Sequence, residues 1–180
     1  MTRKLNMTSL PMGYRAVVIG AGGGIGAAIA DQIAADGRCG QLYALSRSGA
    51  AGPSRATRMA ADVTDAASLA AAAATIGAAG PIDLIVIASG LLHRGDAVQP
   101  EKSWRAIRAD SFAALFAVNA TGPMLAIAAL LPHVARDRRA LIGAVGARVG
   151  NIGDNRVGGW YGYRASKAAL AMLIRTLAIE

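Results

Sequence analysis

Two side chains four residues apart, Tyr163 and Lys167, are well suited to acid–base chemistry. On an α-helix, residues i and i+4 share one face, so the phenol and the ammonium group would lie side by side. The positive charge would lower the pKa of the phenol, which could then donate a proton to a carbonyl oxygen. A Tyr-x-x-x-Lys pair also occurs as an ordinary surface pair, so its meaning depends on the elements that position it.

The segment 20–26 (GAGGGIG) lies between a predicted strand, 15–19, and a predicted helix, 25–35. Its glycines let the backbone turn sharply and let a pyrophosphate approach without meeting a Cβ atom. The helix N-terminus adds free N–H groups and the positive end of the helix dipole. A tight turn without a ligand is the alternative, but the strand–turn–helix context favours a dinucleotide site. The predicted cofactor-binding residues in this turn are Gly20, Gly24, Ile25 and Gly26.

The choice of dinucleotide depends on the end of the second predicted strand, 41–45. An NAD-binding protein carries Asp or Glu about twenty residues after the glycine turn, whereas this chain has Ser46 and Arg47. A hydroxyl and a guanidinium suit a 2′-phosphate, so NADP(H) is favoured over NAD(H). Arg47 as a solvated loop residue is the alternative. Asp62 could accept from the adenine amino group or serve as a turn carboxylate, and both readings stay open.

Strands alternate with helices along the chain, which predicts an α/β fold with a doubly wound parallel sheet in a single domain, 14–180. Further strands are expected at 58–61, 82–88 and 140–145, and further helices at 66–76, at 103–119 continuing to 134, and from 161. Residues 1–13 read as a flexible leader. The chain stops inside an apolar helix, so we expect it to be shortened at the C-terminus.

Composition narrows the partners and the compartment. The chain has 180 residues, 19 Lys and Arg against 11 Asp and Glu, and a formal net charge of +8. The positive residues are scattered without interleaved aromatics, which disfavours nucleic acid. The apolar run 16–30 is shorter than the about 20 residues that a membrane span needs. One cysteine, Cys39, and no cluster of metal ligands fit a cytoplasmic protein without a metal.

Taken together, the glycine turn and the segment 163–167 (YRASK) resemble the short-chain dehydrogenase/reductase family, over about residues 15–180. More narrowly, the chain resembles the C-factor-like group of that family. The segments that carry this second resemblance are 90–93 (GLLH), 100–102 (PEK), 118–123 (VNATGP) and 155–161 (NRVGGWY). The resemblance implies a Rossmann fold, NAD(P)-dependent carbonyl/alcohol chemistry on a small molecule, and a homodimer or homotetramer.

The resemblance also implies roles for individual residues. Tyr163 matches the catalytic acid/base, Lys167 the lysine that binds the nicotinamide ribose, and Asn119 the asparagine that holds a water in the proton relay. A simple N-x-G turn is the alternative for Asn119. Gly90 matches the glycine that follows the fourth strand next to the cofactor. His93 lies near the expected substrate mouth, whereas His133 reads as a helix-end residue.

The chain departs from the family where the catalytic serine is expected. That position is Gly146 or Ala147, and no Ser or Thr occurs between Gly122 and Ser166. Losing one such donor typically costs about 10²–10³ in rate, and Asn151 is a conceivable substitute. The leading hypothesis is an NADP(H)-dependent oxidoreductase. The alternatives are a non-catalytic nucleotide-binding or signalling protein on the same scaffold and a basic nucleic-acid-binding protein.

Overall fold

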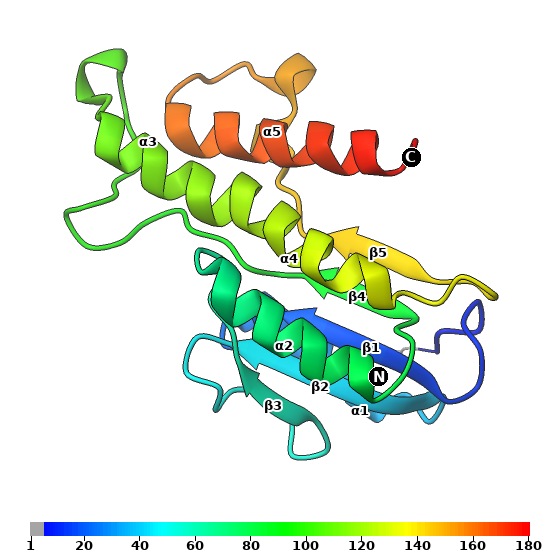
Figure 1. Cartoon of the computed structure of the whole chain (residues 1–180). Coiled ribbons are helices and arrows are strands. Elements are labelled where there is room, and N and C mark those ends of the chain that lie inside the picture. Colours follow the sequence, from blue (N-terminus) through cyan, green and yellow to red (C-terminus); the bar gives the residue numbers. More distant parts are fainter. Residues whose placement is uncertain (1–5) are drawn as a thin grey trace.

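The computed structural model describes residues 6–180, in which five parallel strands carry helices on both sides (Figure 1). The strands are β1 (Tyr14–Ile19), β2 (Cys39–Ser46), β3 (Thr57–Ala60), β4 (Leu84–Ile87) and β5 (Leu141–Ala144). The α-helices are α1 (Gly24–Ala35), α2 (Ala66–Ala78), α3 (Ala109–Phe116), α4 (Gly122–Leu130) and α5 (Tyr161–Leu177). In the spatial order β3-β2-β1-β4-β5, the chain adds β2 and β3 on one side of β1 and adds β4 and β5 on the other side. The predicted doubly wound sheet is therefore confirmed.

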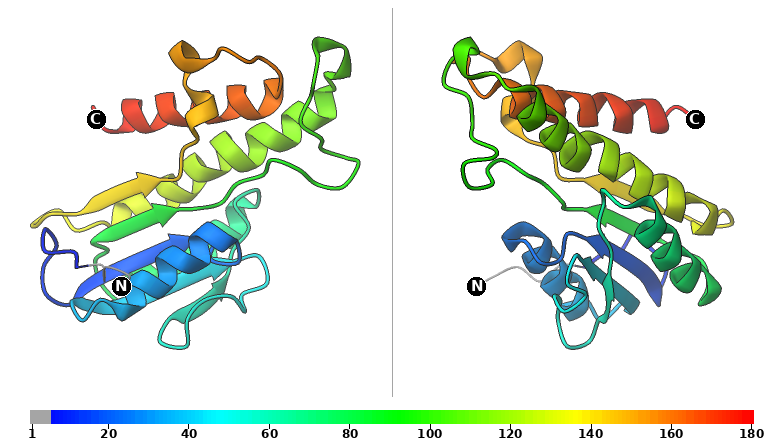
Figure 2. Two further views of the ribbon diagram at one scale, coloured as in Figure 1. Left: turned by 180° about the vertical axis from the view of Figure 1, so that it is seen from behind. Right: turned by 60° about the vertical axis from the view of Figure 1, so that its left-hand side comes forward.

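The two faces of the sheet bury separate cores because successive strand residues point to opposite sides. Val17 and Ile19 of β1 face a core closed by α2 and α4, and the end of α5 packs on its margin. Ala16 and Val18 face a second core closed by α1. Figure 2 shows α1 alone on its side of the sheet and the other helices on the opposite side. The strand ends that define the site are therefore fixed by packing from both faces.

The helix predicted over 103–134 begins later than expected. A 3₁₀ turn occupies Trp104–Ala106 and residues 107 and 108 are extended, so α3 starts at Ala109. The preceding segment instead follows a path past the start of α5, where the Glu101 carbonyl accepts a hydrogen bond from Trp160 N. The prediction that the helix starts at 103 is therefore wrong, because a tertiary contact holds this segment extended.

Proline does not interrupt this helix. Between α3 and α4 the chain forms a π-helical turn, Ala117–Thr121, in which Gly122 N–H donates to Ala117 O, five residues back. Pro123 lacks an N–H and its ring crowds the preceding turn, and such wider turns relieve that crowding. The helix thus continues through Gly122 and Pro123, as predicted, and Asn119 lies in the widened turn.

The stretch from Ala109 to His133 is long and apolar enough to cross a membrane, by length and composition alone. In this fold, α4 packs against α2, while α3 packs against α5. Buried positions such as Leu115, Ile127 and Leu130 belong to the protein core. The stretch therefore has the packing of a core helix.

The N-terminal segment 6–13, predicted to be a flexible leader, contacts the domain closely. Leu10 is buried in the core on the α1 side. Met7 N donates to Asp36 Oδ2 at 3.0 Å, and Gly13 N donates to Arg38 O at 2.8 Å. These bonds attach the segment to the connection between α1 and β2. Residues 1–5 of the predicted leader lie outside the described residues.

Candidate active site

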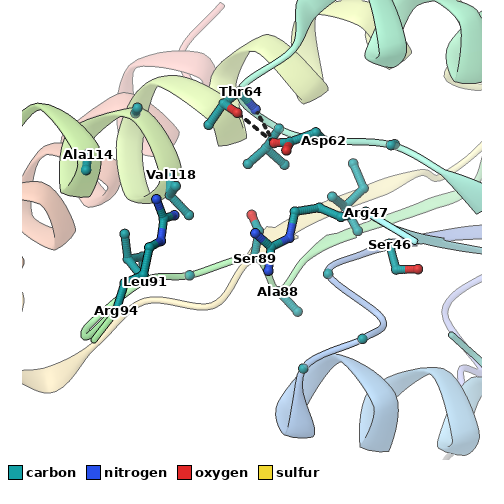
Figure 3. A pocket seen from close by; sticks show the side chains of 18 of the residues that line it. Ser46, Arg47, Asp62, Thr64, Ala88, Ser89, Leu91, Arg94, Ala114 and Val118 are labelled. Carbon is teal, nitrogen blue, oxygen red and sulfur yellow. Dashed lines mark hydrogen bonds between the residues drawn. The ribbon is translucent and has the colours of Figure 1, made fainter. Parts of the chain in front are cut away.

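A cavity of about 790 Å³ lies at the carboxyl ends of β1, β2 and β4, where the strand order reverses. This is the place where doubly wound sheets bind ligands. Figure 3 shows side chains from several of these strand ends directed toward the cavity. Of the residues predicted to bind a cofactor, those that line it are Gly20, Ser46, Arg47, Asp62 and Gly90.

The glycine turn closes one end of the cavity. Gly20 has φ of +89°, a conformation that favours glycine. A Cβ atom on Gly26 would lie 2.1 Å from Gly20 O, so only glycine lets α1 approach the turn this closely. Gly22 and Gly23 line the cavity, whereas Gly24, Ile25 and Gly26 lie on α1 beside it. Gly26 therefore shapes the turn through packing.

Two arginines reach the cavity from opposite sides. Figure 3 shows Arg47 extending inward from the end of β2, while Arg94 extends from the loop that follows β4. Asp62 accepts hydrogen bonds from Thr64 N at 2.9 Å and Thr64 Oγ1 at 2.7 Å. These bonds lower the pKa of Asp62, and the charges of both arginines lower it further. Asp62 thus serves as a turn carboxylate and also faces the cavity.

Ser89 carries a buried hydroxyl next to the cavity. Its Oγ atom is inaccessible to solvent and has no hydrogen-bond partner among the described residues. Buried polar atoms in proteins are nearly always paired, so Ser89 Oγ is an exception among the described residues. The glycine turn and Arg47 make the cavity suitable for a dinucleotide.

Arg94 and Ser89 line the cavity and are not among the residues predicted to bind a cofactor. Arg94 belongs to no motif, and the fold alone brings it opposite Arg47. Ser89 directly precedes Gly90, a predicted cofactor residue, and that neighbour was the available signal. His93, predicted near a substrate mouth, also lines the cavity, while His133 packs against Gly77 of α2.

Asn119 connects the cavity wall to α5. Its Oδ1 accepts from Leu91 N at 2.7 Å, and its Nδ2 donates to Leu91 O at 2.7 Å and to Ser166 Oγ at 3.0 Å. The side chain is completely buried. Asn119 is therefore a helical residue, and the alternative of a simple N-x-G turn is wrong because the wider turn keeps the helix continuous.

Lys167 lies beside the same wall. Its Nζ donates to Val145 O, just beyond β5, at 2.9 Å. A Cβ atom on Gly90 would lie 3.7 Å from Lys167 Nζ and 3.8 Å from Asn119 Oδ1. The structure therefore brings Lys167 and Asn119 together at Gly90, which lines the cavity. Burial lowers the pKa of Lys167.

Tyr163 lies one helical turn before Lys167 and is partly buried. Burial raises the pKa of its phenol, and no contribution from Lys167 accompanies that effect. The expectation that the ammonium lowers the pKa of this phenol is wrong for the protein alone, because burial dominates and Lys167 is directed to Val145 O. The ring of Tyr163 meets that of Trp160 edge-on, with centroids 6.3 Å apart.

No hydroxyl stands at the expected serine position. Gly146 and Ala147 follow β5 directly, ahead of a 3₁₀ turn, Arg148–Gly150. Ser166 Oγ is occupied inside α5, where it donates to Tyr163 O at 2.9 Å. Asn151, the conceivable substitute, uses its side-chain oxygen to accept from Gly153 N at 3.0 Å. Tyr163 and Lys167 therefore lie on one helix, without a hydroxyl at the expected serine position.

Known proteins resemble this chain over most of its length. Residues 14–180 match the family model described as short chain dehydrogenase. Galactitol 2-dehydrogenase (L-tagatose-forming) of Cereibacter sphaeroides is 35% identical over 93% of this chain and 65% of its own length. C-signal of Myxococcus xanthus is 30% identical over 56% of this chain and 57% of its own length. A short-chain dehydrogenase/reductase structure from Burkholderia multivorans with bound NADP superposes with a TM-score of 0.77, at 27% identity, over 92% of this chain and 72% of its own.

The sheet is parallel, and a glycine-lined cavity lies where its strand order changes direction, between β1 and β4. Together with Tyr163 and Lys167 on α5, this arrangement defines a dinucleotide-binding domain of the Rossmann type. The chain belongs to the short-chain dehydrogenase family. It spans less than two thirds of the length of the two curated relatives described above.

Proposed function

We propose that this protein is an NADP(H)-dependent oxidoreductase that interconverts a carbonyl and an alcohol by hydride transfer. The observation that carries the proposal is the continuity of the site. Gly90 lines the same cavity as the glycine turn and Arg47, and a Cβ atom on Gly90 would lie 3.7 Å from Lys167 Nζ and 3.8 Å from Asn119 Oδ1. A nucleotide bound along this cavity would reach the helix that carries Tyr163.

The cofactor would be bound by backbone N–H groups and by polar and charged side chains. The glycine turn presents N–H groups to the pyrophosphate, and Ser46 and Arg47 would bind the 2′-phosphate. Bound NADPH supplies the hydride for the reaction. The NADP bound in the Burkholderia multivorans structure supports this choice.

Residues of this chain donate and accept the proton of the reaction. In the reductive direction, Tyr163 donates its phenolic proton to the carbonyl oxygen, and in the oxidative direction it accepts a proton from the alcohol. Lys167 binds the nicotinamide ribose. Asn119 connects the cavity wall to α5 through its hydrogen bonds to Leu91 and Ser166. Galactitol 2-dehydrogenase as a relative supports a polyol or ketose substrate.

Reversing the charge at Arg47 tests the cofactor assignment. In fluorescence titrations, we expect the unsubstituted protein to bind NADPH more tightly than NADH. We expect Arg47→Asp to weaken NADPH binding about 10- to 100-fold, because a charge-assisted bond to the phosphate is lost. NADH binding should change little. Arg58→Asp, an exposed charge reversal on β3, is the matched control and should leave both affinities unchanged. Equal affinities of the unsubstituted protein for both nucleotides would contradict the NADP preference.

A non-catalytic nucleotide-binding or signalling role is the second candidate. The absence of a hydroxyl at Gly146 and Ala147 favours it. Tight NADPH binding without turnover of any ketone, aldehyde or polyol in a substrate panel would select this role over the enzyme.

We also propose a cytoplasmic homodimer or homotetramer that uses the surfaces of the helices around residues 103–119 and 160–180. Trp104 and Met172 are exposed apolar side chains in these two regions, 62% and 66% accessible. Light scattering at tens of micromolar protein should give at least twice the chain mass, and a monomer would contradict the assembly.

A further inference from the structure

The helix that carries Tyr163 begins in an unusual turn. Gly158, Gly159 and Trp160 have φ values of +71°, +64° and +53°. Trp160 is the only non-glycine residue with positive φ among residues 6–180. An L-residue in this conformation is strained and persists only where its surroundings hold it in place. The groups that hold Trp160 therefore also hold the first turn of α5.

Glu101 holds this turn from one side, although it lies about sixty residues earlier in the chain. Its side chain is buried, with only 3% of the residue accessible. Its carbonyl oxygen accepts from Trp160 N at 2.6 Å, and its carboxylate oxygens accept from Gly162 N at 3.3 Å. The carboxylate thus lies at the N-terminus of a 17-residue helix, where unpaired N–H groups and the helix dipole favour a negative charge.

Close packing leaves this contact little freedom. A Cβ atom on Gly162 would lie 3.1 Å from Glu101 Oε1 and 2.7 Å from Leu115 Cδ1. Glycine at this position therefore lets Glu101 approach the backbone of α5, while Leu115 of α3 closes the other side. Gly162 directly precedes Tyr163, so a movement of this contact would displace the phenol.

Arg164 holds the same turn from the other side. Its guanidinium donates to Gly159 O at 3.0 Å and to Gly158 O at 3.1 Å. It also donates to Val149 O at 3.1 Å, which ties the turn to the loop after β5. Tyr163 thus lies between two anchored residues, Gly162 and Arg164.

We propose that Glu101 is a positioning residue for the acid/base step, which it serves by fixing the left-handed turn and thereby the place of the Tyr163 phenol. Glu101 does not line the nucleotide cavity. Its loss should therefore affect proton transfer and leave cofactor binding intact. The inference rests on the proposed oxidoreductase function, and its test needs one measurement that does not depend on turnover.

The first measurement compares kinetic constants of Glu101→Ala, Glu101→Gln and the control Lys102→Ala, an exposed neighbour. We expect Glu101→Ala to lower kcat about 10- to 100-fold, because a small displacement of a catalytic group has effects of this size. The KM for NADPH should stay within about twofold of the original value, since the cavity is untouched. Glu101→Gln keeps an acceptor oxygen for Gly162 N and should recover most of kcat. Unchanged kcat in Glu101→Ala would overturn the proposal.

The second measurement is hydrogen exchange of the backbone amides in the protein without ligand. In Glu101→Ala, we expect amides 160–164 to exchange at least about tenfold faster, while amides 170–177 of the same helix keep their protection. Unchanged exchange at 160–164 would overturn the proposal even if kcat fell. If the unsubstituted chain reduces no carbonyl, the proposed function fails, and exchange alone then shows whether Glu101 holds the segment around Tyr163.

Discussion

Replacing Tyr163 by Phe should nearly abolish carbonyl reduction while leaving NADPH binding unchanged. The phenol is the proton donor of the proposed reaction, and a positioned general acid contributes about 10²–10⁴ in rate. The ring of Phe keeps the edge contact with Trp160, and the cavity does not include residue 163. Single-turnover measurements with NADPH and a ketone, together with a fluorescence titration of NADPH, would separate the two effects.

Tyr161→Phe is the matched control, since Tyr161 lies on the same helix and is 38% exposed. Its rate should be unchanged. The pH dependence supplies a second check. Burial raises the pKa of Tyr163, so its phenol remains protonated throughout the neutral range. The reductive rate should therefore stay flat at neutral pH and fall only as alkaline pH removes the proton. A Tyr163→Phe variant that keeps full activity would exclude Tyr163 as the acid.

Replacing Gly26 by Ala should eliminate measurable nucleotide binding and destabilise the fold. The new methyl group would lie 2.1 Å from Gly20 O, a backbone atom that can move only if the whole turn moves. Overpacking of this kind typically costs about 1–3 kcal/mol. NADPH affinity should fall by more than about 100-fold, because the N–H groups of the turn lose their alignment with the pyrophosphate. Thermal unfolding and fluorescence titration would measure the two losses.

Gly24→Ala provides the control in the same turn. A Cβ atom at Gly24 would meet no protein atom within 4 Å, so this substitution should leave stability almost unchanged. Equal damage from Gly24→Ala and Gly26→Ala would show that close packing against Gly20 is not the reason for glycine at position 26.

Local chemistry made most of the fold predictable. Asp65 is an N-cap residue, and in the structure its carboxylate accepts from Ala67 N and Ser68 N, so α2 begins where the pattern indicates. The apolar run that became β4 is buried on both faces, as a central parallel strand requires. The start of α3 was missed because Glu101, ahead of it, bonds to the backbone of Trp160 and Gly162, contacts that no local pattern records.

The candidate site was predictable only where backbone chemistry demands particular residue types. The tight turn requires glycine at positions 20 and 26. Arg47 lies about twenty residues after the turn in the sequence, where the residue that selects the dinucleotide is expected. Arg94 reaches the cavity from an irregular loop, so its position depends on tertiary structure. The direction of the pKa shift of Tyr163 was mispredicted. Helical spacing places Lys167 on the same face as Tyr163, but it does not specify that the ammonium of Lys167 bonds to Val145 O.

The two guanidiniums that flank the cavity also act before any contact is made. Arg47 and Arg94 face each other across a space with one nearby carboxylate, Asp62, on a chain whose formal charge is +8. Such a cleft focuses the electric field and raises the local concentration of an anionic ligand. The attraction reaches about 8 Å at physiological ionic strength. The basic balance of this chain therefore speeds the capture of a phosphate-rich nucleotide, with added salt slowing association more than dissociation.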